Sequence, residues 1–253
     1  MYSTMTSHPA GELLRSHDEG FSGLSWPCGH AGILDGLLGP CRLPPWAADP
    51  AEAVVAMSLA GRRGQAPMTS ASSPRPGILL DRDGTIIVDH GYVGAVDCVD
   101  FIEGAPEAIA KFNRANVPVA VVTNQAGVAR GYYGIDDVTK VHRHIVERLA
   151  DYGAHIDLFL FSPYHPEGVV KAFAHTSEDR KPGPGMAKAA AAALNLDLTA
   201  SWVVGDRPED IGMAAAIGAS AIYLGPDDCR RPGVWPFPSL AVAATFILER
   251  ITV

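Results

Sequence analysis

Short apolar runs alternate with helical patterns from Pro76 onward, and this alternation limits the possible folds more than any other feature of the chain. The runs that predict strands are Ile78–Leu80, Val117–Val122, Leu158–Phe161, Trp202–Val204 and Ala221–Leu224. Parallel strands need long crossover connections, and a helix between consecutive strands supplies one with a right-handed path. The sequence therefore predicts an α/β, Rossmann-like fold of three layers with a central parallel sheet of about five strands.

Three segments carry helix signals. The segment 136–152 places apolar residues at spacings of three and four, namely Val138, Val141, Ile145, Leu149 and Tyr152. The segment Pro208–Ile217 begins with a proline suited to the first helical turn, and Gly218 follows its end. The apolar segment Leu240–Ile251 is expected to pack as a final helix.

Residues 1–76 differ from the rest of the chain. They contain scattered Gly, Pro and Ser without sustained periodicity, and they close in a linker-like stretch at 65–74. We expect this segment to be a disordered or mis-annotated N-terminal extension, and residues 77–253 to form the functional domain. Within that domain, Gly84–Glu103 is too short for an inserted cap domain, which needs at least about 50 residues, so an open site is expected.

Composition and charge exclude several classes of protein. The formal net charge of the 253 residues is -8, which argues against a nucleic-acid binder because such proteins usually present a basic face. No apolar run approaches the roughly 18 residues that span a bilayer, and the four cysteines are scattered, as in a reducing cytoplasm. We therefore expect a cytoplasmic protein with a small-molecule partner, neither nucleic acid nor membrane.

Two carboxylates, Asp81 and Asp83, directly follow the first apolar run. The carboxyl ends of strands are where open α/β sheets bind ligands. There, one carboxylate could attack a phosphoryl group while the other transfers the proton. A plain Asp-rich turn is the alternative. A calcium loop does not fit, because the apolar segment 86–88 stands where further oxygen ligands would be needed.

Three more polar residues stand where a phosphate site would need them. Thr123 follows the second run and could hydrogen-bond a phosphoryl oxygen. Lys181 lies just before a proline in an extended loop and could neutralise the phosphoryl charge. Asp206 follows the fourth run and, with Asp81 and the backbone carbonyl of Asp83, could hold Mg²⁺. Each position also has an ordinary interpretation as a strand end, a surface turn or a helix cap.

In this order, Asp81-x-Asp83-Gly-Thr, Thr123-Asn, Lys181, and Gly-Asp206 with Asp210 resemble the four motifs of the haloacid dehalogenase (HAD) superfamily of Mg²⁺-dependent phosphohydrolases. The resemblance covers about residues 77–225. Within it, the segments 89–93, 123–131 and 180–186 closely resemble the heptose 1,7-bisphosphate 7-phosphatases of lipopolysaccharide biosynthesis. The histidinol-phosphate phosphatases are near relatives and remain the alternative. A non-catalytic binding protein is the rival from another class, and the intact motif residues weigh against it.

The resemblance implies roles for individual residues. Those implied for catalysis are Asp81 as nucleophile, Asp83 as general acid and base, Thr123 on the phosphoryl oxygen and Lys181 as charge neutraliser. Those implied for Mg²⁺ are Asp81, Asp83 and Asp206. Those implied for substrate binding are Asn124, Arg130, Arg180, His90 and Tyr92.

The chain departs from the family pattern in the loop before Arg180. Many members bind a structural zinc there through Cys-x-His and Cys-x-Cys, whereas this chain has Ser162, Tyr164, Ser177 and Asp179 at those places. A structural zinc site needs four ligands, usually Cys or His. We therefore expect no zinc, and a loop held by other contacts.

Overall fold

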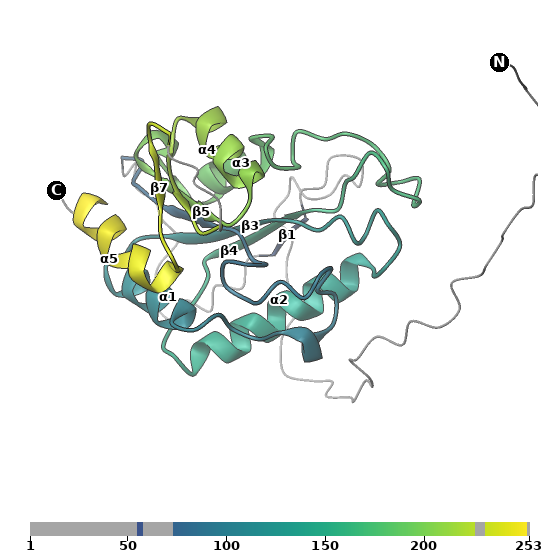
Figure 1. Cartoon of the computed structure of the whole chain (residues 1–253), viewed down its shortest axis with the longest axis horizontal. Coiled ribbons are helices and arrows are strands. Elements are labelled where there is room, and N and C mark those ends of the chain that lie inside the picture. Colours follow the sequence, from purple (N-terminus) through teal and green to yellow (C-terminus); the bar gives the residue numbers. More distant parts are fainter. Residues whose placement is uncertain (1–54, 58–72, 226–230, 252–253) are drawn as a thin grey trace, which may run out of the picture. The chain divides into compact units, whose positions relative to one another are not determined.

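The structure of the protein is a computed structural model, and it describes residues 55–57, 73–225 and 231–251 (Figure 1). In this part of the chain seven strands form one sheet, in the order β1-β4-β3-β2-β5-β6-β7. They are β1 (Val55–Met57), β2 (Ile78–Leu80), β3 (Val119–Asn124), β4 (Leu158–Ser162), β5 (Trp202–Gly205), β6 (Ser220–Tyr223) and β7 (Val234–Pro236). All neighbouring strands are parallel except β1, which pairs with β4 in the antiparallel direction.

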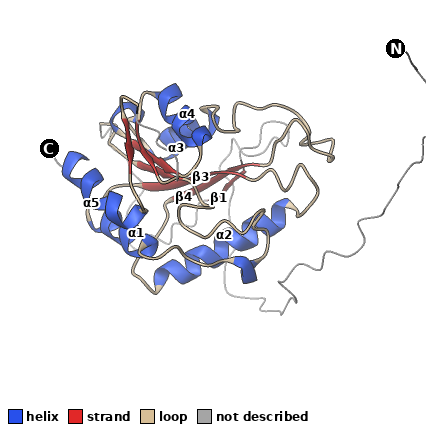
Figure 2. Ribbon diagram, in the orientation of Figure 1, coloured by secondary structure: helices blue, strands red, loops and turns tan. Residues whose placement is uncertain are grey.

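Helices cover both faces of the sheet, which gives the three layers seen in Figure 2. The helices are α1 (Ala105–Arg114), α2 (Ile135–Ala150), α3 (Gly185–Leu194), α4 (Pro208–Ile217) and α5 (Leu240–Ile251), and short 3₁₀ turns lie at Val96–Cys98 and Leu198–Ala200. Side chains of a strand alternate between its two faces. Accordingly, Ile78 and Leu80 pack in one core with α1, α2 and α5, whereas Leu79 packs in the other with α3 and α4.

The predicted fold class is confirmed. Each of the five predicted runs forms a strand, and the predicted helices at Pro208–Ile217 and Leu240–Ile251 have the expected bounds. The sheet is larger than expected because β7 and β1 extend its two edges. Between Gly84 and Glu103 the chain forms only turns, bridges and one 3₁₀ turn, so no cap domain is present there.

Strand β1 lies inside the segment 1–76, whose other residues before 73 are outside the described part of the chain. The predicted nature of that segment therefore stays a prediction. In the described residues, no helix combines the length and the apolar character that crossing a membrane requires.

The strand order indicates where on the sheet a ligand would bind. The chain starts the parallel sheet at β2, adds β3 and β4 on one side, and then adds β5 and β6 on the other. A doubly wound sheet binds ligands outside the carboxyl ends of its strands at such a reversal of order. Asp81, Thr123 and Asp206 therefore meet, because they lie at the ends of β2, β3 and β5.

Helix α2 carries a histidine in the core. His142 is fully buried, its ring stacks on Phe159 with centroids 4.6 Å apart, and neither ring nitrogen has a hydrogen-bond partner among the described residues. Burial, helped by the charge of Arg82, lowers the pKa of His142 well below its ordinary value. Below about pH 6.5 the unfolded chain would thus bind a proton that the folded chain excludes, so acid favours unfolding.

We expect His142→Phe to make the protein less sensitive to mild acid. Between about pH 7.5 and pH 5.5 the buried imidazole should cost the wild type on the order of 1 kcal/mol of unfolding free energy, and the variant lacks this component. Urea denaturation at both pH values, with EDTA present, measures it. Ile145→Val, a change in the core of the same helix, should lower stability but keep the wild-type pH dependence. Equal pH dependence in His142→Phe and the wild type would contradict the prediction.

Candidate active site

Lys181 joins two buried aspartates at the carboxyl edge of the sheet. Its Nζ lies 2.9 Å from Oδ1 of Asp81 and 2.6 Å from Oδ1 of Asp210. Burial disfavours the charge of Lys181, but the two carboxylates outweigh it and raise its pKa above the ordinary value. Lys181 therefore stays a cation, and it neutralises charge directly beside Asp81.

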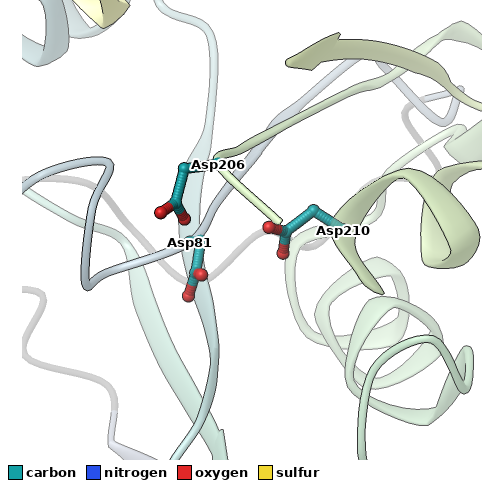
Figure 3. Close-up of side chains that lie close together, drawn as sticks. All are labelled: Asp81, Asp206 and Asp210. Atoms are coloured by element: carbon teal, nitrogen blue, oxygen red, sulfur yellow. The ribbon is translucent and has the colours of Figure 1, made fainter. Parts of the chain in front are cut away.

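Three carboxylates converge at this edge. One oxygen each of Asp81, Asp206 and Asp210 can be chosen so that all lie within 4.8 Å of one another (Figure 3). Burial, and then repulsion by Asp81, raise the pKa of Asp206 to about 6. Burial raises the pKa of Asp210 as well, although Lys181 opposes the shift. The accumulated negative charge favours a cation in this position.

One oxygen of the cluster is available for such a cation. Oδ1 of Asp206 is buried and finds no hydrogen-bond donor in the described part of the chain. Gly84 leaves room for this carboxylate, because its φ is +78° and a Cβ there would overlap Asp206. The predicted Mg²⁺ ligands are the side chains of Asp81 and Asp206 and the backbone carbonyl of Asp83, and the side-chain cluster adds Asp210 to the two carboxylates.

The carboxylate of Asp83 points instead to Arg82, which is fully buried. Nε of Arg82 donates to Oδ2 of Asp83 at 3.1 Å, and Nη2 donates to Oδ1 at 3.0 Å. A guanidinium fork of this kind fixes the orientation of a carboxylate. Asp83 is still within the site, because it lines the same pocket as Asp81.

That pocket contains most of the predicted site residues. From the predicted set, its lining includes Asp81, Asp83, Tyr92, Thr123, Asn124, Arg180 and Lys181. Three described residues of the predicted set, His90, Arg130 and Asp206, do not line it, although Asp206 lies beside Asp81 in the carboxylate cluster. His90 is exposed, with Nε2 2.9 Å from Oδ2 of Asp100, and Nη2 of Arg130 lies 3.4 Å from Nε2 of His165.

The side chain of Asn124 hydrogen-bonds the backbone of Lys181 twice. Its Nδ2 donates to the carbonyl of Lys181 at 3.1 Å, and its Oδ1 accepts from the N–H of Lys181 at 3.0 Å. These two bonds hold Lys181 against the end of β3. The predicted contact of Asn124 with substrate remains a prediction.

The predicted site residues did not include Arg207, His165, Gln125 and Tyr133, which also line the pocket. Arg207 directly follows Asp206 at the sheet edge, so its position in the sequence was a usable signal. Its Nη2 lies 2.6 Å from Oδ2 of Asp89, which ties the segment before Tyr92 to the end of β5. Tyr133 lies in a loop, and an aromatic residue there carries no sequence signal.

Aromatic packing holds the loop that lacks the family's zinc ligands. Tyr164 is buried, and its ring lies 4.6 Å from that of His175 and 6.0 Å from that of Phe173, centroid to centroid. The carbonyl of Tyr164 accepts a hydrogen bond from Nη1 of Arg180 at 3.2 Å. The loop thereby orients Arg180, whose pKa is lowered by burial, toward the pocket.

An α/β sheet with Asp81, Thr123, Lys181 and Asp206 at its carboxyl edge defines a hydrolase of the HAD-like class. A family model described as HAD-hydrolase-like matches residues 179–232. A HAD-like phosphatase structure from Mesorhizobium loti has a TM-score of 0.66 and 34% identity, covering 71% of this chain and 87% of that one.

The sequence comparison is more specific. The D-glycero-β-D-manno-heptose-1,7-bisphosphate 7-phosphatase of Yersinia pestis is 42% identical over 149 residues, 58% of this chain and 79% of that protein. The enzyme of the same name from Escherichia coli K12 is 38% identical over 176 residues, 70% of this chain and 90% of that protein. The chain therefore belongs to the family of these HAD-like 7-phosphatases, and it is a phosphatase.

A solved structure extends the comparison to a complex. The D,D-heptose 1,7-bisphosphate phosphatase of B. bronchiseptica, complexed with magnesium and phosphate, has a TM-score of 0.62 and 28% identity. The match covers 69% of this chain and 98% of that one.

Proposed function

We propose that this protein is a Mg²⁺-dependent phosphatase that removes the 7-phosphate from D-glycero-D-manno-heptose 1,7-bisphosphate and leaves heptose 1-phosphate. The observation that carries the proposal is the pocket in which Asp81, Asp83, Thr123 and Lys181 converge in a chain about 40% identical to phosphatases of that name. The reaction proceeds through an aspartyl-phosphate on Asp81.

The chain's own residues divide the chemistry between them. Asp81 attacks phosphorus, and Lys181, at 2.9 Å from its Oδ1, orients it and balances the charge of the phosphoryl group. The hydroxyl of Thr123 donates a hydrogen bond to a phosphoryl oxygen. Asp83 gives a proton to the departing sugar oxygen, and its carboxylate then takes one from the water that hydrolyses the aspartyl-phosphate.

The acidic cluster suits a magnesium ion. Carboxylate oxygens are the ligands that Mg²⁺ prefers, and the unpartnered Oδ1 of Asp206 beside Asp81 supplies one. The backbone carbonyl of Asp83 is the third protein oxygen that we assign to it. A Mg²⁺ held there would neutralise charge on the phosphoryl group. The magnesium and phosphate in the B. bronchiseptica relative support this assignment.

The second phosphate of the substrate needs cations at a distance from Lys181. Arg180 and Arg207 both line the pocket. In the sequence, Arg180 directly precedes Lys181, and Arg207 directly follows Asp206. A guanidinium binds phosphate with two parallel hydrogen bonds, which also fixes orientation. We assign Arg180 to the distal phosphate, with Tyr92 over the sugar. Histidinol phosphate, which has one phosphate, would not use such a subsite.

The test is phosphate release from heptose 1,7-bisphosphate, histidinol phosphate and common hexose phosphates, with Mg²⁺ and with EDTA. We expect release that requires Mg²⁺, with kcat/KM at least about 100-fold higher for the bisphosphate, and heptose 1-phosphate as the product by ³¹P NMR. Preference for another compound would retain the mechanism and refute the heptose assignment. No release from any of them would contradict the proposed function.

A further inference from the structure

A buried glutamine, Gln125, contacts two groups of the proposed reaction, the acid–base carboxylate of Asp83 and the hydroxyl of Thr123. Gln125 follows β3, is 2% exposed and donates from one nitrogen, Nε2, to two acceptors. Oδ2 of Asp83 lies 2.8 Å from this nitrogen, and Oγ1 of Thr123 lies 2.9 Å from it. The same amide group therefore contacts the acid–base carboxylate and the hydroxyl at the phosphoryl position.

The bond to Thr123 decides where its hydroxyl hydrogen can go. A hydroxyl offers one donor hydrogen and two acceptor lone pairs. Because Oγ1 accepts from Gln125, the hydrogen remains available to another acceptor, and Thr123 lines the pocket where the phosphoryl group would lie. An amide turned the other way would present its oxygen to Thr123 and take that hydrogen.

The orientation of the amide is in turn set by donors on its oxygen. Oε1 of Gln125 accepts from Nη2 of Arg82 at 3.0 Å and from the hydroxyl of Tyr133 at 2.8 Å. A turned amide would place its NH₂ group against both of these donors and its oxygen against the Asp83 carboxylate. Two donors on one side and a carboxylate on the other thus select a single orientation.

The position of the Tyr133 ring is fixed by close packing. Its ring packs against Gly94 and Gly127, and a Cβ at either glycine would overlap the ring. Burial raises the pKa of the Tyr133 hydroxyl, so it remains a donor at every pH at which the protein would work. A phenylalanine in this position would keep the packing and remove only the hydroxyl.

We propose that Tyr133 is a positioning residue: its hydroxyl fixes the Gln125 amide, which orients both the Asp83 carboxylate and the Thr123 hydroxyl for phosphoryl transfer. Tyr133 acts through Gln125, so the effect of losing its hydroxyl depends on Gln125 being present. The inference rests on the proposed phosphatase mechanism at this site and is independent of which sugar phosphate is the substrate.

The first test compares leaving groups. A sugar oxygen needs the proton from Asp83 to depart, whereas 4-nitrophenolate departs without one. Because general acid catalysis contributes about 10²- to 10⁴-fold, partial misplacement of Asp83 in Tyr133→Phe should lower kcat/KM for the preferred sugar phosphate about 10-fold. The same variant should lose less than about threefold with 4-nitrophenyl phosphate, because only the contact of Thr123 with the phosphoryl group is then affected. No loss, or an equal loss on both substrates, would overturn the proposal.

A double-mutant cycle tests the route through Gln125. Gln125→Met removes the amide and should lower kcat/KM for the sugar phosphate by about 100-fold. Adding Tyr133→Phe to it should change the rate by less than about twofold, because coupled residues are not additive. A full additional loss would overturn the proposal. The matched control is Tyr152→Phe, at an exposed tyrosine whose ring packs on Phe101, and it should behave as the wild type.

A measurement without substrate separates this inference from the proposed function. The side-chain NH₂ resonances of Gln125, assigned by their loss in Gln125→Met, should exchange with solvent at least about 10-fold faster in Tyr133→Phe, because local opening governs exchange. Unchanged exchange would refute the positioning role even in an active enzyme. A wild type inactive on every phosphate ester would refute the proposed function, and with it this inference.

Discussion

Asp81→Asn is expected to lower the rate of phosphate release by at least about 10⁴-fold, because an amide cannot replace the carboxylate as nucleophile. The change keeps the size of the side chain and removes one of three carboxylates that lie within 4.8 Å, so the fold should be retained. Phosphate release under saturating Mg²⁺ measures the loss, and circular dichroism confirms the fold. Acid quenching of the wild type during turnover should trap phosphate on the peptide that contains Asp81.

The control for this experiment is Asp136→Asn, at an exposed aspartate in the first turn of α2, which should keep wild-type activity. Activity of Asp81→Asn within about 10-fold of the wild type would refute the nucleophile assignment, since removing a nucleophile costs far more. Phosphate trapped on a different aspartate would refute it as well.

Lys181→Met should have the second large effect, on stability as well as activity. The change leaves Asp81 and Asp210 buried without the ammonium that lies within 2.9 Å of both. Breaking a buried ion pair by removing one partner typically costs about 3–5 kcal/mol, and we expect a loss of this size in unfolding free energy. Urea denaturation in EDTA measures it, and phosphate release should fall by at least about 100-fold because the phosphoryl charge is no longer balanced.

Two further variants test whether the unpaired carboxylates cause the loss of stability in Lys181→Met. Adding Asp210→Asn to Lys181→Met should recover part of the stability, because one unpaired buried charge is removed, but it should not recover activity. Lys188→Met, at an exposed lysine on α3, should change unfolding free energy by no more than about 0.5 kcal/mol. If Lys181→Met were as stable as the wild type, the two carboxylates would not depend on Lys181 for their charge balance.

The strands were predictable because their side chains are buried on both faces. Runs such as Leu158–Phe161 are continuously apolar, and the structure buries every residue of β4. By contrast, β7 has only partly buried or exposed residues and ends in a proline. Pro232 and Pro236 flank only two apolar residues there, which does not separate β7 from a loop, and β1 lies in the segment 1–76, which shows no sustained periodicity.

The site residues that lie directly at the end of a predicted strand could be predicted from the sequence. Asp81, Thr123 and Asp206 lie at strand ends, and the strand order then requires them to meet. Arg130 had the residue type expected of a phosphate ligand, but its guanidinium turns to His165 and Glu167. A loop residue's direction depends on long-range contacts, which no local pattern encodes.

The sequence by itself determined the parallel α/β architecture, the absence of room for a cap between Gly84 and Glu103, and the residues at the strand ends. These follow from apolar periodicity and from covalent order, both of which are local. Only the tertiary structure decided that Asp83 turns to Arg82, that Asp210 shares Lys181 with Asp81, and that Tyr133 reaches Gln125. Each of these contacts depends on buried polar groups finding partners, and burial is a property of the packed chain as a whole.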